Sequence, residues 1–142
     1  MLGFTCLTFL VVRVPVAYMQ PGGQDEACYA VPGMMVLRNG VASLPHVPAR
    51  NAESVYYRAD QALYSEPPLT FYLQAVLFAV LPDQYGTARV VSILAGIGML
   101  LMLFLFAKQL GITTAAALWG VALLSCSRWL YFAALMLSLI HI

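Results

Sequence analysis

The run from Val90 to Ala107 constrains the fold of this chain more than any other feature. Its sequence, VVSILAGIGMLLMLFLFA, contains no charged side chain, and Arg89 and Lys108 stand at its two ends. As a helix it would extend about 27 Å at 1.5 Å per residue, which is enough to cross the hydrocarbon core of a bilayer. We therefore predict a transmembrane helix over residues 90–107.

The composition agrees with a membrane protein. Of the 142 residues, 62% are hydrophobic and 9% are charged, whereas soluble domains contain about 25% charged residues. The net charge of +1 argues against a nucleic-acid-binding protein, which needs a basic face. The three cysteines, at positions 6, 28 and 126, have the spacing of neither a disulfide framework nor a zinc site.

Two more apolar runs predict a bundle of three transmembrane helices. Residues 2–19 lack the basic start and small-residue cleavage site of a signal peptide, so we interpret them as the first span. Residues 113–131 follow a tight connection and would return antiparallel to residues 90–107. The predicted fold is thus an all-α integral membrane protein with three transmembrane helices. Arg13, inside the first span, would either serve a function or snorkel to the nearer interface.

Alternation of the spans places residues 20–89 in a long extracytoplasmic loop, with Lys108 on the cytoplasmic side. In this loop we predict a helix over residues 26–38, with Pro32 as a kink and Gly40 as its stop. A second short helix is predicted over residues 52–64. The prolines at 45 and 48 predict an extended segment between these two helices.

The apolar run at residues 68–81 lies between prolines and is too short to cross a bilayer. Its helical part would extend about 21 Å. The pattern favours an amphipathic helix at the membrane surface. A re-entrant or tilted span is the alternative.

Asp25 and Glu26 are adjacent acids just beyond the first span. A carboxylate there could be a general base for an acceptor hydroxyl, or could hold a divalent cation beside a phosphate. It could also simply cap the helix that follows. From the dipeptide alone, the cap is the favoured interpretation.

Three motifs, QDEACYA, SEPPLTFYLQA and YGTARVVSILAG, occur in an order and spacing that resemble family 39 membrane glycosyltransferases. This group includes the dolichyl-phosphate-mannose-protein mannosyltransferases and the lipid A aminoarabinose transferases, which have the C-type fold. The resemblance covers about residues 10 to 131. It implies inverting transfer of a sugar from a polyprenyl-phosphate donor to an acceptor hydroxyl on a protein or glycolipid. It also implies a bacterial inner membrane location with an extracytoplasmic catalytic loop.

The resemblance also implies roles for individual residues. Asp25 would be the catalytic base and Glu26 would support or orient it. The helix that carries Pro67, Pro68 and Tyr72 would form one wall of the donor groove.

The donor phosphate would need positive charge or a metal. By charge alone, its candidate contacts are Arg13, Arg58 and Arg89, each with an alternative as a snorkelling or loop arginine. Glu66 stands where some relatives have a basic residue, so a divalent cation, Mg or Mn, could act there instead. A possible metal set is Asp25, His46 and Glu66, with a surface histidine as the alternative for His46.

Relatives of this group have more spans and a second loop that contributes to the active site. We therefore expect residues 1–136 to be the N-terminal part of such a domain, inactive alone, and residues 137–142 to be a non-native tail. Two other functions remain as alternatives. One is a non-catalytic transporter subunit or membrane scaffold. The other is a membrane ligase that uses an oligosaccharide diphosphate donor.

Overall fold

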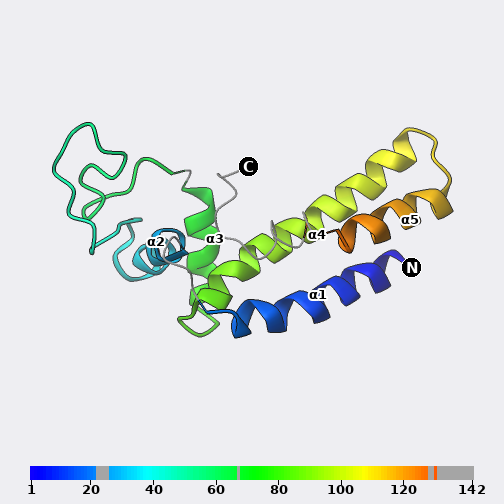
Figure 1. Ribbon diagram of the computed structural model, residues 1–142, viewed down its shortest axis with the longest axis horizontal. Coiled ribbons are helices and arrows are strands. Elements are labelled where there is room, and N and C mark those ends of the chain that lie inside the picture. Colours follow the sequence, from blue (N-terminus) through cyan, green and yellow to red (C-terminus); the bar gives the residue numbers. More distant parts are fainter. Residues whose placement is uncertain (22–25, 67, 128–129, 131–142) are drawn as a thin grey trace.

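The computed structural model describes residues 1–21, 26–66, 68–127 and 130, and within them it contains five α-helices and no strand (Figure 1). The helices are α1 (Leu2–Met19), α2 (Glu26–Asn39), α3 (Leu69–Phe78), α4 (Tyr85–Gln109) and α5 (Thr114–Ser125). The prediction of an all-helical chain is confirmed for these residues.

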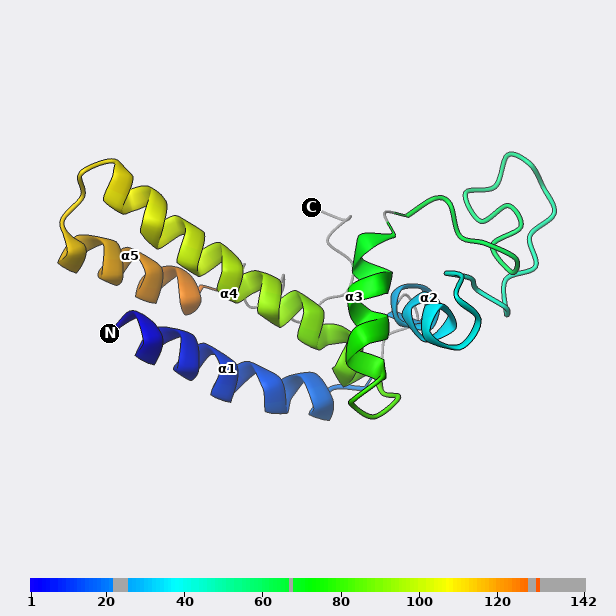
Figure 2. The same cartoon turned by 180° about the vertical axis from the view of Figure 1, so that it is seen from behind.

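Helices α1, α4 and α5 lie side by side and form an elongated arm (Figures 1 and 2). α1 and α4 are long and apolar enough to cross a membrane. The bounds of α1 match the prediction. α4 begins five residues earlier than predicted, at Tyr85, so Arg89 lies within the helix instead of before it.

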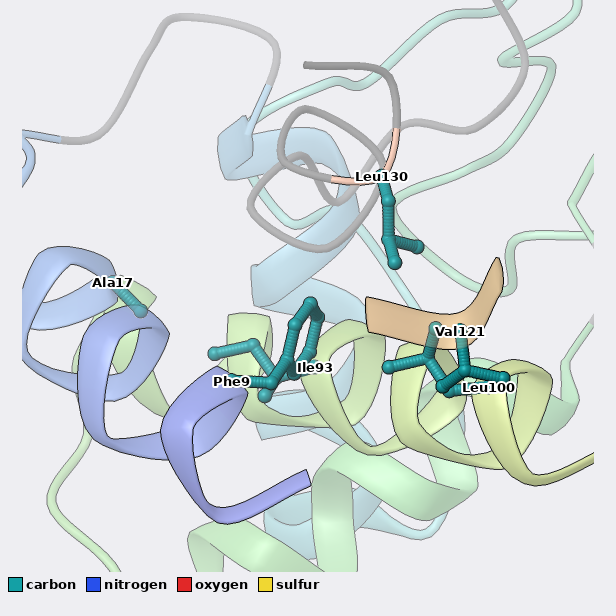
Figure 3. Packing of buried hydrophobic residues seen from close by; sticks show 6 residues of the cluster. All are labelled: Phe9, Ala17, Ile93, Leu100, Val121 and Leu130. Atoms are coloured by element: carbon teal, nitrogen blue, oxygen red, sulfur yellow. The ribbon is translucent and has the colours of Figure 1, made fainter. Parts of the chain in front are cut away.

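The core of the arm combines side chains from its three helices. Figure 3 shows Phe9 of α1 beside Ile93 of α4, and Val121 of α5 beside Leu100 of α4. The outward side chains are also apolar, and the largest exposed ones include Phe4, Val11, Met102, Phe106, Trp119 and Leu123. An apolar surface of this extent is typical of contact with lipid or with further protein.

α5 is shorter than the predicted third span. Lys108 Nζ donates to Ile112 O at 3.3 Å and lies 3.0 Å from Thr114 Oγ1, which closes the turn between α4 and α5. From there α5 has 12 residues and ends at Ser125. At 1.5 Å per residue this is about 18 Å, so the described part of residues 113–131 does not form a full span.

α2 and α3 lie at the end of the arm where α1 finishes and α4 begins (Figure 1). α2 ends as predicted, because Gly40 has φ 75° and its N–H donates to Val36 O at 2.9 Å. Pro32 is buried inside α2. α3 spans fewer residues than the predicted helix at 68–81, since the chain turns after Phe78.

The predicted helix over residues 52–64 is wrong, and the segment forms a series of turns. Its backbone bonds within its own turns and also to the preceding extended segment. Leu44 N–H donates to Ala59 O at 2.7 Å, and Leu63 N–H donates to Ala42 O at 2.7 Å. These bonds bury Leu44, Ala59 and Leu63 with Phe71 of α3, and this burial outweighs the local helical preference of the segment.

Candidate functional site

The polar centre of the structure is a buried ion pair between Arg89 of α4 and Glu26 of α2. Arg89 Nε donates to Glu26 Oε1 at 2.8 Å, and Arg89 Nη2 donates to Glu26 Oε2 at 2.5 Å. The side chain of Arg89 is 2% exposed and that of Glu26 is 16% exposed. This two-bonded geometry is the strongest that an arginine makes with a carboxylate.

The other donors of Arg89 close the end of α1. Nη1 donates to Ala17 O at 2.6 Å and to Gln20 O at 2.9 Å, and Nη2 donates to Pro21 O at 3.2 Å. These carbonyls stand at the helix C-terminus, where the backbone lacks partners and carries partial negative charge. A guanidinium has five N–H donors, so all of them are used within the chain.

This arrangement bears directly on Asp25, which lies outside the described residues. Arg89 bonds to Pro21 on one side of residues 22–25 and to Glu26 on the other. One guanidinium therefore holds the described residues on both sides of residues 22–25, Pro21 and Glu26.

A second set of contacts fixes the start of α4 against α1. Thr87 Oγ1 donates to Pro82 O at 2.6 Å, so the Tyr18 hydroxyl, 3.1 Å away, donates to Thr87 Oγ1. Gly86 lets the Tyr18 ring approach, since a Cβ at Gly86 would lie 2.5 Å from Tyr18 Cδ1. The backbone around Arg89 is thus held independently of its ion pair.

The first turn of α2 also meets the long loop. Tyr56 packs against the same buried cluster as Cys28. Burial raises the pKa of the Tyr56 phenol, and the nearby Cys28, Tyr29 and Glu66 raise it further. The phenol therefore stays protonated at neutral pH and can donate a hydrogen bond close to Cys28, in the first turn of α2.

The remaining candidate residues lie in different surroundings. Arg58 is exposed, has φ 53° and stacks over the Tyr57 ring at 6.0 Å. His46 is exposed, and Glu66 is half-buried. Tyr72 is exposed on α3, and Pro68 immediately precedes that helix.

Two expectations concern residues that the structure does not describe. Pro67 and Asp25 lie outside the described residues, so neither the catalytic role of Asp25 nor its place in a metal set is tested. Among the residues that are described, no group of three or more His, Cys, Asp or Glu could hold a metal ion.

Arg13 has a partner inside the arm. Its side chain is buried in the arm, and Nη2 donates to Ser125 O at 3.2 Å. An arginine on the inner face of a membrane helix commonly pairs with backbone carbonyls of a neighbouring helix, as Arg13 does here.

Sequence reasoning did not identify the pairing of Glu26 with Arg89, nor the approach of Tyr56 to α2. An arginine at the start of an apolar helix predicts a carboxylate partner nearby, since a buried charge needs an opposite charge. The chain matches no protein-family model, no curated protein and no solved structure. Its functional interpretation therefore depends on its motifs and on this geometry.

Proposed function

We propose that this chain belongs to a membrane glycosyltransferase that moves a sugar from a polyprenyl-phosphate donor to an acceptor hydroxyl, with inversion. The observation that carries the proposal is the contact between Glu26 and Arg89. These residues come from two of the three resembling motifs and are 63 positions apart. Motifs that serve one active site have to meet in space, and these two do.

The helix that carries the third motif, SEPPLTFYLQA, packs next to the helices of the other two. Ala30 of α2, Phe78 of α3 and Ala88 of α4 form one buried cluster. The helix that follows the Pro-Pro pair therefore packs beside the Asp-Glu helix and the Ala-Arg helix. This is the neighbourhood that a donor groove beside the catalytic acids needs.

In the proposed reaction, Asp25 accepts the proton of the acceptor hydroxyl. The acceptor oxygen forms a bond to the anomeric carbon of the sugar, and the bond from that carbon to the phosphate oxygen breaks. Polyprenyl phosphate leaves with the bonding electrons. Both oxygens of Glu26 accept hydrogen bonds from Arg89. Its role is to hold the neighbouring Asp25 in place.

Arg89 would have a positioning role instead of a phosphate contact, since its five donors are used within the chain. Arg58, or a divalent cation such as Mg or Mn near Glu66, remains the proposed counter-charge for the donor phosphate. Tyr72, on the exposed face of α3, would contact the lipid part of the donor.

The proposed setting is the extracytoplasmic face of a bacterial inner membrane. α1 and α4 would cross the bilayer, residues 113–131 would contribute a third crossing, and further spans would complete the bundle. An apolar exposed stripe on α3, formed by Leu69, Leu73 and Val76, supports a position of this helix at the outer interface.

The donor class can be tested with membranes that contain the full-length protein. We expect transfer of labelled sugar from a polyprenyl-phosphate sugar, with inverted anomeric configuration in the product by NMR. Transfer only from an oligosaccharide on a polyprenyl diphosphate would favour a ligase. No transfer from either donor, with every tested acceptor class present, would contradict the proposal.

A further inference from the structure

α5 ends inside the helical arm. Its last helical residue is Ser125, and α5 lies along only part of α4 (Figures 1 and 2). The Ser125 carbonyl accepts a hydrogen bond from Arg13 Nη2 at 3.2 Å, and Arg13 belongs to the middle of α1. The end of one helix therefore stands beside the interior of another.

Such a helix end needs a partner. The last carbonyls of a helix have no N–H donors within that helix, and they carry the negative end of the helix dipole. Between apolar helices, where water is scarce, unpaired carbonyls are strongly unfavourable. A cation at this position supplies both a hydrogen-bond donor and a favourable charge.

Arg13 suits this task. Its side chain is 7% exposed, and its guanidinium carbon lies 5.3 Å from the centre of the Phe9 ring, one helical turn away. An arginine keeps its charge under all ordinary conditions. Its presence in the interior of the arm therefore needs a fixed negative partner, which the end of α5 provides.

We infer that Arg13 is the C-terminal cap of α5 and that it fixes the point where this helix stops inside the bundle. The inference does not depend on the proposed sugar transfer. Arg89 makes the same kind of contact with the end of α1 through Ala17, Gln20 and Pro21. Each of these helix ends is thus closed by an arginine from a neighbouring helix.

The contact can be observed through one carbonyl. Ser125–Cys126 is the only Ser-Cys pair in the sequence. Labelling serine with carbonyl ¹³C and cysteine with ¹⁵N therefore gives a single cross-peak in an HNCO spectrum of the 142-residue chain in micelles. We expect this peak to move in R13Q, because the carbonyl loses its charged donor. R38Q, which alters an exposed arginine, should leave it unchanged.

An unchanged Ser125 peak in a helical R13Q chain would overturn the inference. If R13Q fails to fold by circular dichroism, R13K gives the same test, since lysine lacks the fork of an arginine and should also shift the peak. Addition of a polyprenyl phosphate to the unmodified chain separates the cap from a phosphate contact. Under the inference the peak stays in place, whereas a move to the R13Q position would show that Arg13 leaves α5 to bind phosphate.

Discussion

Arg89 of α4 holds Glu26 of α2 through two hydrogen bonds of 2.8 and 2.5 Å, while its other donors hold the end of α1. One side chain therefore joins three helices at the place where the chain leaves its first apolar helix. The stability of this end of the molecule should depend strongly on both partners.

Replacement of Glu26 by Gln should lower the free energy of unfolding by about 3–5 kcal/mol, because it leaves a buried charge without its partner. Urea unfolding in detergent micelles would measure the change. The control is R38Q, which breaks the exposed ion pair with Asp83 and should cost less than about 1 kcal/mol. Equal losses in the two variants would contradict a buried, structurally important pair.

Two glycines of α4 should respond oppositely to alanine. At Gly86 a Cβ would lie 2.5–2.9 Å from ring atoms of Tyr18, whereas at Gly98 it would meet nothing within 4 Å. Gly86→Ala should therefore destabilise the fold by about 1–3 kcal/mol through overpacking. Gly98→Ala should stabilise the helix by up to about 1 kcal/mol. Thermal unfolding of both variants checks the prediction, and a neutral Gly86→Ala would show that Tyr18 does not pack there.

The amide of Gln74 is fully buried, and within the described part of the chain neither of its polar atoms has a hydrogen-bond partner. A Cβ at Gly33 of α2 would lie 2.5 Å from Gln74 Oε1, so α2 and α3 meet closely at this point. Gln74→Leu keeps most of the volume and removes an unsatisfied polar group, which should raise stability by about 1–3 kcal/mol. A loss of stability in urea unfolding would show that the amide has a partner, such as a bound water.

Asp60 should titrate at unusually low pH. The side-chain hydrogen bonds of Arg50, both at 2.7 Å, lower the pKa of the Asp60 carboxyl below its ordinary value. The unfolded value is about 3.9. A lowered pKa in the folded state stabilises the fold above that pH, and the contribution is lost as the pH falls through the folded-state pKa.

Carboxyl ¹³C NMR titration would measure this pKa directly. Arg50→Gln should move the pKa of Asp60 back towards about 3.9, while R38Q should leave it unchanged. A wild-type Asp60 that titrates at its ordinary value would show that the pair does not form in solution.

The sequence predicts the long elements of this fold well, since the apolar runs and Gly40 mark where α1 and α2 end. It does not predict the loop over residues 52–64. There the backbone bonds to residues 42–49, and Arg58 adopts a positive φ, so contacts distant in sequence override local preference. Likewise, α5 stops at Ser125 although the apolar pattern continues. The pattern does not predict this end, since hydrophobicity alone does not show where a neighbouring arginine can cap a helix.

The candidate site was predictable only as separate motifs. Glu26 and Arg89 both stand at the borders of apolar runs, but their pairing depends on how α1, α2 and α4 meet. The contact between Tyr56 and the first turn of α2 depends on the loop, which local pattern does not encode.

We propose that Asp25, next to the Glu26–Arg89 pair, is the base for sugar transfer. The most direct test is the rate of transfer from a polyprenyl-phosphate sugar by Asp25→Asn in membranes that contain the full-length protein. The control is Asp83→Asn, which alters an exposed acid of the same loop. We predict a loss of about 10²–10⁴-fold for Asp25→Asn at normal expression, with the control near the wild-type rate. A wild-type rate for Asp25→Asn would contradict the account.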